Sequence, residues 1–578
     1  MRKETVGRQG FSKRKEQSFM KVVIVGGVAG GAGTAARLRR NDESAEIIMM
    51  ERGQYISYAN CGLPYYVGGV ITDKGALQLQ TPERFHQRFG VDVRTESEVL
   101  SVNCANKTVL VRHGEQIYEE TYDKLVLSPG AAPIRPAIPG IEKNHVFTLR
   151  NIPDTYAIYD YIKAEKPGSC AVIGAGFIGL EMAENLAEQG IHVSVVEGAS
   201  HVMPPIDMDV AHQVHNYIRS KGISLYLGQT CTAMDEDGVI LKNGNKVQAD
   251  MVILSIGVRP DTAFLKDSGI ALGTRGEILV NNYMETSQPD VYALGDAVSV
   301  RHVVSGEPVL IPLASPANKQ GRIVGDNLCG RKRRYEGSQG TSIMKFFDLT
   351  VAVTGEKEET LQARGANYQK VITTSASQAG YYPGGEMMTV KTLFVPETGR
   401  ILGCQIVGGK GVDKRIDDMA NAVRFGMTCF DLQEMELAYA PPFSSAKDPV
   451  NMAGYVIGNV VEGLMKPFYI ENLDQIPETA IRLDVRTPGE CAGGMMPGFI
   501  NIPLDSLRER LDELDADKEI YITCQIGLRG YLAQRILEQH GFRTWNIVGG
   551  YRLYDMMQKD LQAMSAVAGM CTECGKEI

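Results

Sequence analysis

Two of the eleven cysteines lie where a sulfur atom could do chemistry, and Cys61 is the first of them. It lies in the segment Ser-Tyr-Ala-Asn-Cys-Gly-Leu-Pro-Tyr-Tyr (residues 57–66), and the next cysteine is Cys104. A thiol that reacts without a second protein cysteine must form a mixed disulfide with a small thiol or pass through a sulfenic acid. A buried, inert cysteine is the alternative.

The second is Cys524, which begins the segment Cys-Gln-Ile-Gly-Leu-Arg (residues 524–529) between a predicted strand over residues 519–523 and a predicted helix. The amide groups of such a loop point inward at the helix N-terminus, which favours a thiolate and an anionic adduct. Four residues separate Cys524 from Arg529, whereas five separate the cysteine and arginine of a cysteine phosphatase loop. The smaller loop suits a persulfide rather than a phosphate. We predict that both residues handle sulfur. A catalytically inactive docking module is the alternative.

The elements around Cys61 begin with a nucleotide-binding pattern. We predict a buried strand over residues 22–25, a glycine turn over 26–31, a helix to residue 40 and a second strand over 46–50 that ends in Glu51. The turn lets a pyrophosphate approach the helix N-terminus, and the carboxylate can hold ribose hydroxyls. Val28 occupies the place of the second glycine of the fingerprint. A tight turn without a ligand is the alternative for a single copy.

A second copy of the pattern is complete. Its glycines are followed by a predicted helix over residues 180–189 and a strand over 191–196 that ends in Glu197. Glu197 would accept from an unmodified ribose and repel a 2′-phosphate, and no arginine follows it through residue 201. We therefore predict NADH rather than NADPH. The residues predicted to bind it are Gly174, Gly176, Phe177, Ile178, Gly179, Glu197 and Gly257.

A third segment, residues 289–297, predicts a strand that ends in Gly295 and Asp296. Together with segments 127–131 and 254–260, the patterns resemble the two-dinucleotide-domain flavoprotein disulfide reductases. The resemblance implies that the first unit and the Gly-Asp segment bind FAD, while the second unit binds the nicotinamide nucleotide. The residues assigned to FAD are Gly26, Gly27, Ala29, Gly30, Gly31, Glu51, Arg52, Ser128, Gly130, Gly295 and Asp296.

Members of that superfamily with an internal redox disulfide have a second cysteine where this chain has Tyr66. The segment around Cys61 and residues 438–448 instead resemble coenzyme A disulfide reductase. This resemblance implies that Cys61 alternates between a thiolate and a mixed disulfide with coenzyme A. Gly33 and Asn318 depart from some relatives. The implied coenzyme A contacts are Arg37, Arg40, Ser57, Asn60 and Lys447, and a solvated helix face is the alternative for the two arginines.

The proton donor to a leaving thiolate is not expected to be histidine, because none lies between His302 and His540. The resemblance points instead to Tyr381 and Tyr439, whose hydroxyl groups could supply a proton or hydrogen bond across a dimer interface. Packing is the alternative role for both tyrosines, and Tyr382 stays an alternative to Tyr381.

From about residue 466 the pattern changes to a small α/β unit that resembles a rhodanese domain, with strands over 481–486 and 519–523 and a helix to residue 514. The whole chain resembles coenzyme A disulfide reductase–rhodanese fusions. The resemblance implies that NADH reduces FAD, which reduces Cys61, and that the substrates are coenzyme A persulfide and polysulfide. A plain coenzyme A disulfide reductase is the alternative, followed by an NADH peroxidase or oxidase and a flavin-bearing redox sensor.

The expected fold class is α/β: two Rossmann-like dinucleotide-binding domains, an α+β dimerisation domain and a C-terminal α/β rhodanese domain. A homodimer is expected, because the superfamily completes its active site across a two-fold axis. The predicted boundaries are a disordered leader over 1–19, the FAD-binding domain over 20–148 and 261–340, the NAD(P)H-binding domain over 149–260, the dimerisation domain over 341–460, the rhodanese domain over 461–560 and a tail over 561–578.

Composition limits the partners and the location. The net charge of −9 argues against broad nucleic-acid affinity, and no segment reaches the roughly 18 apolar residues of a membrane span. Scattered cysteines indicate a reducing compartment, so we expect a cytoplasmic protein. Cys571 and Cys574 form a single C-x-x-C pair, which falls short of a zinc site, so we expect a frayed tail there and no metal.

Overall fold

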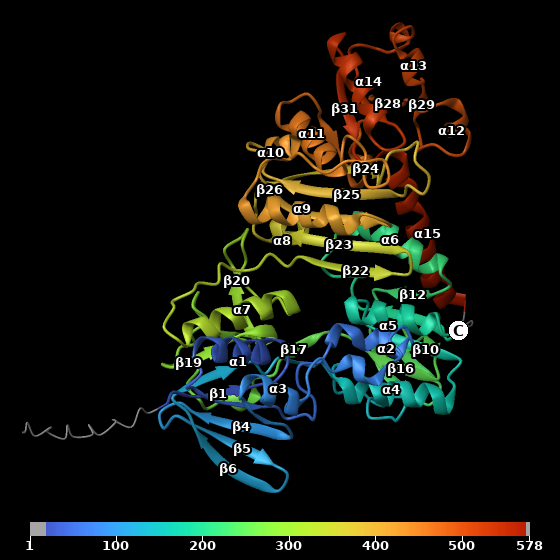
Figure 1. Ribbon diagram of the computed structural model, residues 1–578. Coiled ribbons are helices and arrows are strands. Elements are labelled where there is room, and N and C mark those ends of the chain that lie inside the picture. Colours follow the sequence, from blue (N-terminus) through green and yellow to red (C-terminus); the bar gives the residue numbers. More distant parts are fainter. Residues whose placement is uncertain (1–18, 574–578) are drawn as a thin grey trace, which may run out of the picture.

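The computed structural model describes residues 19–573. The predicted leader, apart from its last residue, and Cys574 lie outside the described residues. Figure 1 shows the two dinucleotide-binding domains side by side, the dimerisation domain above them and the C-terminal domain at the far end. Four five-stranded sheets form the centres of these parts.

The first dinucleotide-binding domain has a parallel sheet in the order β19–β7–β1–β2–β3. Its valine- and isoleucine-rich strands are buried on both faces, as in other parallel sheets that helices cover. The helices α1 (Ala29–Asn41) and α7 (Ala314–Asn327) pack against each other over this sheet. The strands are β1 (Lys21–Val25), β2 (Glu46–Met50), β3 (Asp92–Arg94), β7 (Lys124–Leu127) and β19 (Val291–Ala293).

Small elements border this domain. Helix α3 (Pro82–Phe89) follows the segment that contains Cys61. Three strands between residues 97 and 121 form an antiparallel sheet. Three short strands between residues 278 and 309 form a mixed sheet, in which the first two pair in parallel and the last two pair antiparallel. The strands are β4 (Ser97–Asn103), β5 (Thr108–His113), β6 (Gln116–Thr121), β18 (Ile278–Leu279), β20 (Val298–Arg301) and β21 (Pro308–Val309).

The second dinucleotide-binding domain repeats the architecture with the order β12–β11–β10–β16–β9. Because β9 (Val146–Phe147) belongs to this sheet, the domain begins slightly before the predicted boundary at residue 149. Its helices are α4 (Ile152–Glu165), α5 (Phe177–Ala187) and α6 (Met208–Ser220). Its other strands are β10 (Ser169–Ile173), β11 (His192–Glu197), β12 (Ser224–Leu227), β13 (Cys231–Asp235), β14 (Gly238–Leu241), β15 (Lys246–Gln248) and β16 (Met251–Leu254).

Two connections hold the dinucleotide-binding domains together. β8 (Ala131–Pro133) pairs with β17 (Val258–Pro260) where the chain passes between them. The short helix α2 (Leu63–Val67), which follows Cys61, packs on α4 and α5 and contributes to the core of the second domain. Cys61 therefore lies at the seam between the two domains.

The dimerisation domain is an antiparallel sheet in the order β22–β23–β26–β25–β24. Its strands are β22 (Ser342–Phe346), β23 (Leu349–Gly355), β24 (Gln369–Ala376), β25 (Met387–Phe394) and β26 (Ile401–Gly408). Its helices are α8 (Glu358–Ala363), α9 (Val412–Phe425), α10 (Cys429–Glu434) and α11 (Pro449–Val461).

The C-terminal domain has a parallel sheet in the order β27–β31–β30–β28–β29. The predicted helix that runs to residue 514 is shorter, because Arg510 leaves the helical conformation between α13 and a short turn over Leu511–Glu513. The strands are β27 (Pro467–Phe468), β28 (Ile481–Asp484), β29 (Ile500–Asn501), β30 (Glu519–Thr523) and β31 (Arg543–Ile547), and the helices are α12 (Pro488–Ala492), α13 (Leu504–Leu507) and α14 (Leu528–Gln539).

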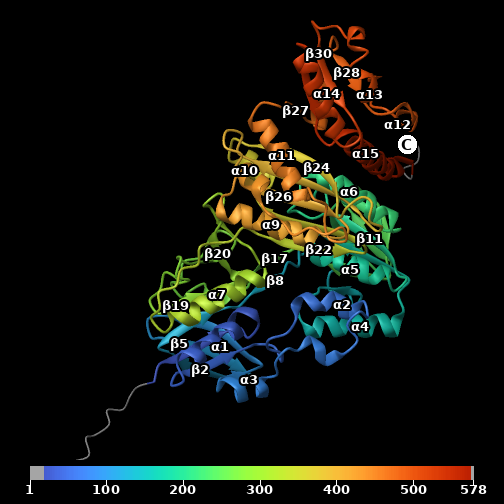
Figure 2. The same ribbon diagram turned by 45° about the horizontal axis from the view of Figure 1, so that its top comes forward.

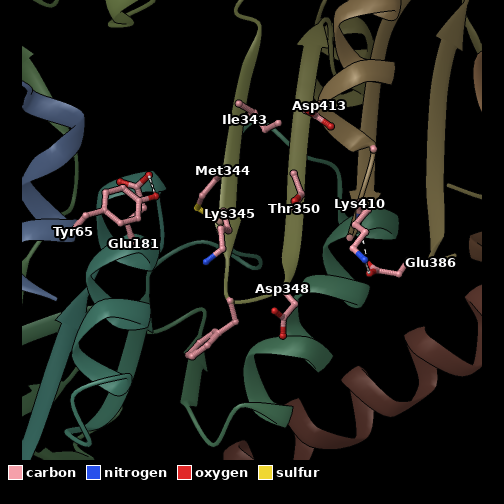
Figure 3. Close-up of a pocket in the computed structure, with 13 residues that line it drawn as sticks. Tyr65, Glu181, Ile343, Met344, Lys345, Asp348, Thr350, Glu386, Lys410 and Asp413 are labelled. Atoms are coloured by element: carbon pink, nitrogen blue, oxygen red, sulfur yellow. Dashed lines mark hydrogen bonds and ion pairs between the residues drawn. The ribbon is translucent and has the colours of Figure 1, made fainter. Parts of the chain in front are cut away.

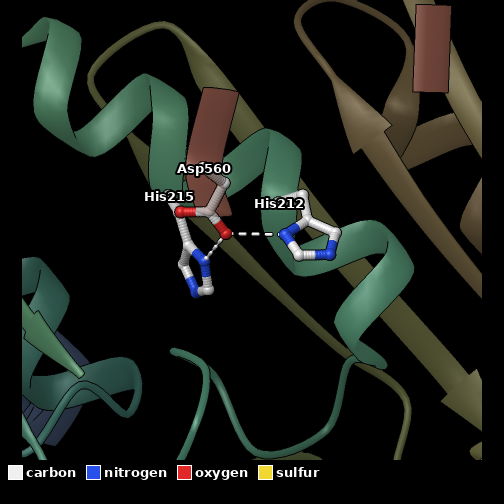
Figure 4. A group of neighbouring side chains, drawn as sticks. All are labelled: His212, His215 and Asp560. Carbon is white, nitrogen blue, oxygen red and sulfur yellow. Dashed lines mark hydrogen bonds and ion pairs between the residues drawn. The ribbon is translucent and has the colours of Figure 1, made fainter. Parts of the chain in front are cut away.

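The last helix, α15 (Gly550–Glu573), leaves the C-terminal domain and packs on α6 of the second dinucleotide-binding domain (Figure 2). The predicted domain end at residue 560 thus falls inside a helix rather than before a tail. The cause is Asp560, which is fully buried between His212, His215 and Arg219 of α6. Figure 4 shows both histidine rings directed at its carboxylate.

Two buried ionic clusters join the domains. In the first, Asp560 Oδ2 lies 2.6 Å from His212 Nδ1 and 2.8 Å from His215 Nδ1. In the second, Lys391 Nζ lies 2.7 Å from Asp209 and 2.9 Å from Asp207. Lys370 of the same cluster lies 2.7 Å from Glu471 of the C-terminal domain. Buried charges of this kind persist when each has an opposite partner.

Across residues 19–573, no helix is long and apolar enough to cross a membrane.

Candidate active site

The first glycine turn is shaped by close backbone packing. Gly26 has φ +98°, and a Cβ on it would lie 2.0 Å from the Ser128 carbonyl oxygen. A Cβ on Gly31 would lie 1.8 Å from the oxygen of Gly26, so the helix can approach the turn only with glycine there. Val28, which departs from the fingerprint, precedes the first residue of α1, where no side chain caps the helix and no acid lies in the first turn.

The predicted partners of this turn surround it. Glu51 accepts from the Gly27 and Gly53 amides at 2.9 Å each, so its carboxylate lies against the glycine turn. Asp296 forms an ion pair of 3.0 Å with Arg150. Gly30 faces the Ser128 hydroxyl, and Gly130 and Gly295 have positive φ. Arg52 is partly exposed and pairs with Asp261.

The second glycine turn has the same geometry. A Cβ on Gly174 would lie 2.4 Å from the Ser255 oxygen, and one on Gly179 would lie 2.0 Å from the oxygen of Gly174. A Cβ on Gly176 would meet nothing within 4 Å. Glu197 accepts from Ala175 and Ala199 amides at 2.7 and 2.8 Å. Phe177 and Ile178 begin α5, and Gly257 has φ +110° beside this turn.

Both turns fit a dinucleotide. Each opens an uncapped helix N-terminus without an acid in its first turn, where backbone N–H groups attract phosphate. The open space at Gly176 leaves room for a pyrophosphate that any larger side chain would fill. The residues present therefore fit two dinucleotides, one in each Rossmann-like domain.

Cys61 lies in a short turn (Asn60–Gly62) directly before α2, and it is exposed. Partial burial of its thiol raises the pKa of Cys61, and the carboxylates of Glu181 and Asp296 raise it further, while Arg150 opposes them. Cys61 is thus close to charged groups of both dinucleotide-binding domains. The chain's own groups favour the thiol over the thiolate.

A cavity of about 650 Å³ opens next to this seam, between α5 and the edge strand β22 (Figure 3). Tyr65 and Glu181 lie at one end, and Lys410 and Glu386 at the other. Burial, and then the nearby Glu184 carboxylate, raise the pKa of Glu181 to about 7. Tyr65, four residues after Cys61, donates to Glu181 over 3.5 Å.

The predicted coenzyme A contacts have different surroundings. Ser57 has φ +44°, a conformation that few non-glycine residues adopt, and its amide donates to the Gly27 oxygen at 2.9 Å. Asn60 Oδ1 is buried without a hydrogen-bond partner among the described residues, which leaves an acceptor free for a ligand. Arg37 pairs with Asp326 at 2.6 Å between α1 and α7, whereas Arg40 and Lys447 are exposed. Arg37 is therefore not part of a solvated helix face, because it forms an ion pair with Asp326 between the two helices.

Tyr381 and Tyr439 come together, although 58 positions separate them in the chain. Their hydroxyl oxygens lie 2.8 Å apart, and this hydrogen bond raises the pKa of Tyr439. Both side chains are exposed, at 76% and 47%, and Phe443, four residues after Tyr439 in the chain, is 71% exposed. Tyr382 turns its backbone oxygen toward Gln378 and is the less exposed of the neighbouring pair.

Cys524 ends a buried strand and begins the loop before α14, as predicted from the segment. Its Sγ accepts from the Gly527 amide at 3.1 Å, and Gly527 has φ +107°. Arg529 forms a two-point ion pair with Glu490 at 2.6 and 2.7 Å, which lowers the pKa of Glu490 to about 2. Cys524 itself is only 1% exposed.

Several residues of the site were not predicted from the sequence. Arg150 follows the first domain and pairs with Asp296, while Tyr65 and Glu181 line the cavity near Cys61. Glu181 lies on the helix that follows the complete glycine fingerprint, and no spacing rule links it to Tyr65. Glu490 lies in α12, and no spacing rule links it to Arg529.

Comparison with known proteins agrees with this geometry. Residues 20–321 match the pyridine nucleotide-disulphide oxidoreductases, residues 341–449 match the dimerisation domain of that family, and residues 470–556 match the rhodanese-like domain. Coenzyme A disulfide reductase of Staphylococcus aureus is 36% identical over 438 residues, which cover 75% of this chain and 99% of the relative.

Two solved structures cover nearly the whole chain. Reduced CoADR-RHD of Bacillus anthracis is 49% identical with a TM-score of 0.92, over 94% of this chain and 99% of that one. A NAD-dependent persulfide reductase from A. fulgidus is 36% identical with a TM-score of 0.87, over 93% and 100%. FAD and a nicotinamide nucleotide are the cofactors of the family, which fits the two glycine turns. This chain therefore belongs to the pyridine nucleotide-disulphide oxidoreductases, as a flavoprotein member that carries its own dimerisation domain and a C-terminal rhodanese-like domain.

Proposed function

We propose that this enzyme uses NADH to reduce coenzyme A persulfide and polysulfides, with Cys61 as its redox sulfur and Cys524 as a sulfur carrier. The observation that carries the proposal is the pairing of an exposed, solitary Cys61 at the seam of two dinucleotide domains with a cysteine loop on a fused domain. The relatives named for coenzyme A disulfide and persulfide reduction support this choice of substrate.

The chemistry at Cys61 needs two steps. The Cys61 thiolate attacks the sulfur bound to the coenzyme A carbon, which forms a Cys61–coenzyme A mixed disulfide and releases hydrosulfide. Two electrons and one proton then cleave this disulfide into the Cys61 thiolate and free coenzyme A. FAD, when bound, supplies the electron pair that NADH delivers. Asn60 and Ser57 hold the substrate beside Cys61, and Arg40 and Lys447 contact its phosphates.

A homodimer completes the site in this proposal. The exposed Tyr381, Tyr439 and Phe443 form an apolar surface on the dimerisation domain, of the kind that oligomers bury. The two hydroxyl groups would then reach the partner's mixed disulfide and donate a proton to the leaving thiolate. A cytoplasmic location is part of the proposal, because the cysteines are scattered along the chain without the spacing of a disulfide framework.

The nicotinamide preference follows from Glu197. Its carboxylate is held by two amides at the end of β11, where it faces the adenosine ribose in the proposed complex. A 2′-phosphate would bring two like charges together, so NADH should be used in preference to NADPH.

A steady-state substrate panel tests the proposal. We expect fast NADH oxidation with coenzyme A persulfide and coenzyme A disulfide, slower oxidation with NADPH, and almost none with hydrogen peroxide. Cys61→Ser should abolish all of these reactions, whereas Cys104→Ser should not. Fast peroxide turnover without coenzyme A would refute the proposal in favour of a peroxidase.

The role of the rhodanese-like domain has its own test. Cys524→Ser should spare coenzyme A disulfide turnover and impair reactions that take sulfane sulfur from bulky donors, with Cys491→Ser of the same domain as control. Equal loss on both substrate types would contradict the division of labour between the two cysteines.

A further inference from the structure

We propose that Glu490 is a positioning residue that selects the sulfur donor of Cys524, and that the selected donors are organic persulfides rather than thiosulfate. Glu490 acts through Arg529: it pairs with this arginine, so the loop does not offer the cation to an inorganic dianion. The inference deepens the proposed function, because it rests on Cys524 as the sulfur carrier and names the class of its donor.

A two-point ion pair cancels the charge of Arg529 next to the reactive sulfur. Arg529 lies in the first turn of α14, two residues after the Gly527 amide that donates to Cys524 Sγ at 3.1 Å. Its two terminal nitrogen atoms lie 2.7 and 2.6 Å from the two carboxylate oxygens of Glu490. Both of its terminal groups therefore have an anionic partner before any donor arrives.

The start of α12 holds the Glu490 carboxylate in place. Its Oε2 atom accepts from the Thr487 amide and from the Thr487 hydroxyl, each at 2.9 Å, in a capping box. Arg529 and these Thr487 groups lower the pKa of Glu490 to about 2. Glu490 is thus ionised and held at neutral pH, and the charge of Arg529 stays paired.

A second arginine at the loop is neutralised in the same way. Arg486 Nη2 lies 2.7 Å from Asp484 Oδ2 and 2.7 Å from the Gly494 oxygen. The Tyr551 ring covers this guanidinium group, with 3.9 Å from its centroid to Arg486 Cζ, and the Tyr551 amide donates to the Cys524 oxygen at 2.7 Å. The two arginines and the two acids cancel, which leaves backbone N–H groups to stabilise negative sulfur.

Arg552 of α15 is a further cation whose backbone lies against the loop. Its amide donates to the Gln525 oxygen at 3.0 Å, and its Nε atom is buried without a hydrogen-bond partner among the described residues. A substitution of Glu490 leaves Arg552 as it is. A change in donor preference caused by such a substitution therefore belongs to Arg529.

The exposed side chains beside the loop are apolar. Leu528 directly follows Gly527, and Leu532 lies one turn further along α14. This surface suits the organic part of a persulfide, whereas thiosulfate has no apolar group to place on it.

Both donors would react by the same sulfur exchange. The Cys524 thiolate attacks the outer sulfur of a persulfide, the S–S bond of the donor breaks, and the inner sulfur leaves as a thiolate. With thiosulfate the same attack releases sulfite, and a dianion must then approach a thiolate without a free Arg529 to offset the repulsion. In both cases the outer sulfur stays on Cys524 as a persulfide, and no further oxidant or reductant takes part.

The test measures sulfur transfer to Cys524 without NADH. Holoenzyme is mixed with equal concentrations of thiosulfate or glutathione persulfide, quenched with an alkylating agent, and analysed by mass spectrometry for persulfide on the Cys524 peptide. We expect transfer from glutathione persulfide to be faster by about 10-fold or more. Equal rates from the two donors would overturn the inference without any variant.

Glu490→Gln keeps the size of the side chain and an acceptor for Thr487, but it frees the charge of Arg529. Transfer from thiosulfate should rise about 10-fold, while transfer from glutathione persulfide should change little. Glu513→Gln is the matched control, because it breaks a two-point pair with Arg510 of the same domain at 2.6 and 2.7 Å. It should change neither rate.

A double variant separates charge from structure. Addition of Arg529→Gln to Glu490→Gln should remove the gain with thiosulfate, although Arg552 is still present. An unchanged donor ratio in Glu490→Gln, or a gain that persists without Arg529, would overturn the inference. Failure of the proposed function would appear instead as no NADH oxidation with coenzyme A persulfide while the donor ratio at Cys524 is intact. Absence of sulfur on Cys524 with either donor would overturn both.

Discussion

Cys61 and Cys524 have opposite electrostatic surroundings: acidic groups lie near the first, and a backbone N–H group donates to the second. Cys61 lies beside the carboxylates of Glu181 and Asp296, which oppose its ionisation. Cys524 Sγ accepts a hydrogen bond from the Gly527 amide at the start of α14, and a helix N-terminus attracts anions. A raised pKa makes the Cys61 thiolate a stronger nucleophile once it has formed, and a carrier of anionic sulfur suits the second environment.

The tyrosine pair gives a prediction at the same scale. Tyr381→Phe or Tyr439→Phe should each lower turnover of coenzyme A disulfide about 10-fold to 100-fold, because each removes a hydroxyl from one proton-donating pair. The double variant should be little worse than either single one. Tyr382→Phe is the matched control. Steady-state kinetics at saturating NADH measures all four, and a loss with Tyr382→Phe alone would contradict the assignment.

The sequence could nominate site residues but not their backbone conformations or long-range partners. The solitary Cys61 could be found because no cysteine follows it before Cys104, and Tyr381 and Tyr439 could be paired only through a resemblance. The left-handed backbone of Ser57 depends on bonds to Gly27 and Leu79, which lie far from it in the chain. Long-range contacts of this kind have no local sequence signal. The same holds for the Arg37–Asp326 pair, which joins residues of α1 and α7.

Elements with a strong local pattern were predicted with accurate bounds. The strands over residues 46–50 and 519–523 have the predicted ends, because Glu51 follows the first apolar run and Cys524 follows the second. Helix α5 begins at Phe177, three residues before the predicted start, since the glycine turn itself completes the first helical turn. The prediction was weakest for the helix expected to run to residue 514. That segment is divided into α13 and a short turn over residues 511–513, and such short elements depend on packing.

The glycines of the second turn offer a prediction about an element. A Cβ on Gly176 meets nothing in the protein, so Gly176→Ala should fold with wild-type stability, within about 0.5 kcal/mol, and raise KM for NADH. A Cβ on Gly179 would lie 2.0 Å from the oxygen of Gly174, so Gly179→Ala should cost about 1–3 kcal/mol. Thermal unfolding and NADH titration separate the two. Equal NADH affinity in Gly176→Ala and wild type would contradict the pyrophosphate assignment.

At the scale of the whole molecule, α15 fastens the rhodanese-like domain to the second dinucleotide-binding domain (Figure 2). Asp560→Ala leaves two histidines and an arginine without their buried acceptor, which should weaken this contact by about 3–5 kcal/mol. Hydrogen exchange of α15 measures the effect. Asp555→Ala, which removes a surface pair with Lys559 on the same helix, is the control. Equal protection in both variants would contradict the fastening role.

The same contact should respond to pH. His215 accepts from the Val202 amide at Nε2 and donates from Nδ1 to Asp560, so it has no site for a second proton. Burial lowers the pKa of His215 below its ordinary 6.5. Because the unfolded chain binds a proton on this histidine more readily than the folded protein does, folding is fully favoured only at pH values above 6.5. This stability is lost as the pH falls below 6.5. After correction for the intrinsic pH dependence of amide exchange, α15 should therefore be less protected at pH 5.5 than at 7.5. Stronger protection at pH 5.5 would contradict this account.

The central claim is that Cys61 forms a mixed disulfide with coenzyme A. The mass of the oxidised protein measures this most directly. Holoenzyme treated with coenzyme A disulfide is denatured without reductant, digested, and analysed for the peptide that bears the adduct. We predict one coenzyme A per chain, bound to Cys61, that disappears on addition of NADH and does not form in Cys61→Ser. An adduct on another cysteine, or an oxidised Cys61 that carries no coenzyme A, would contradict the account.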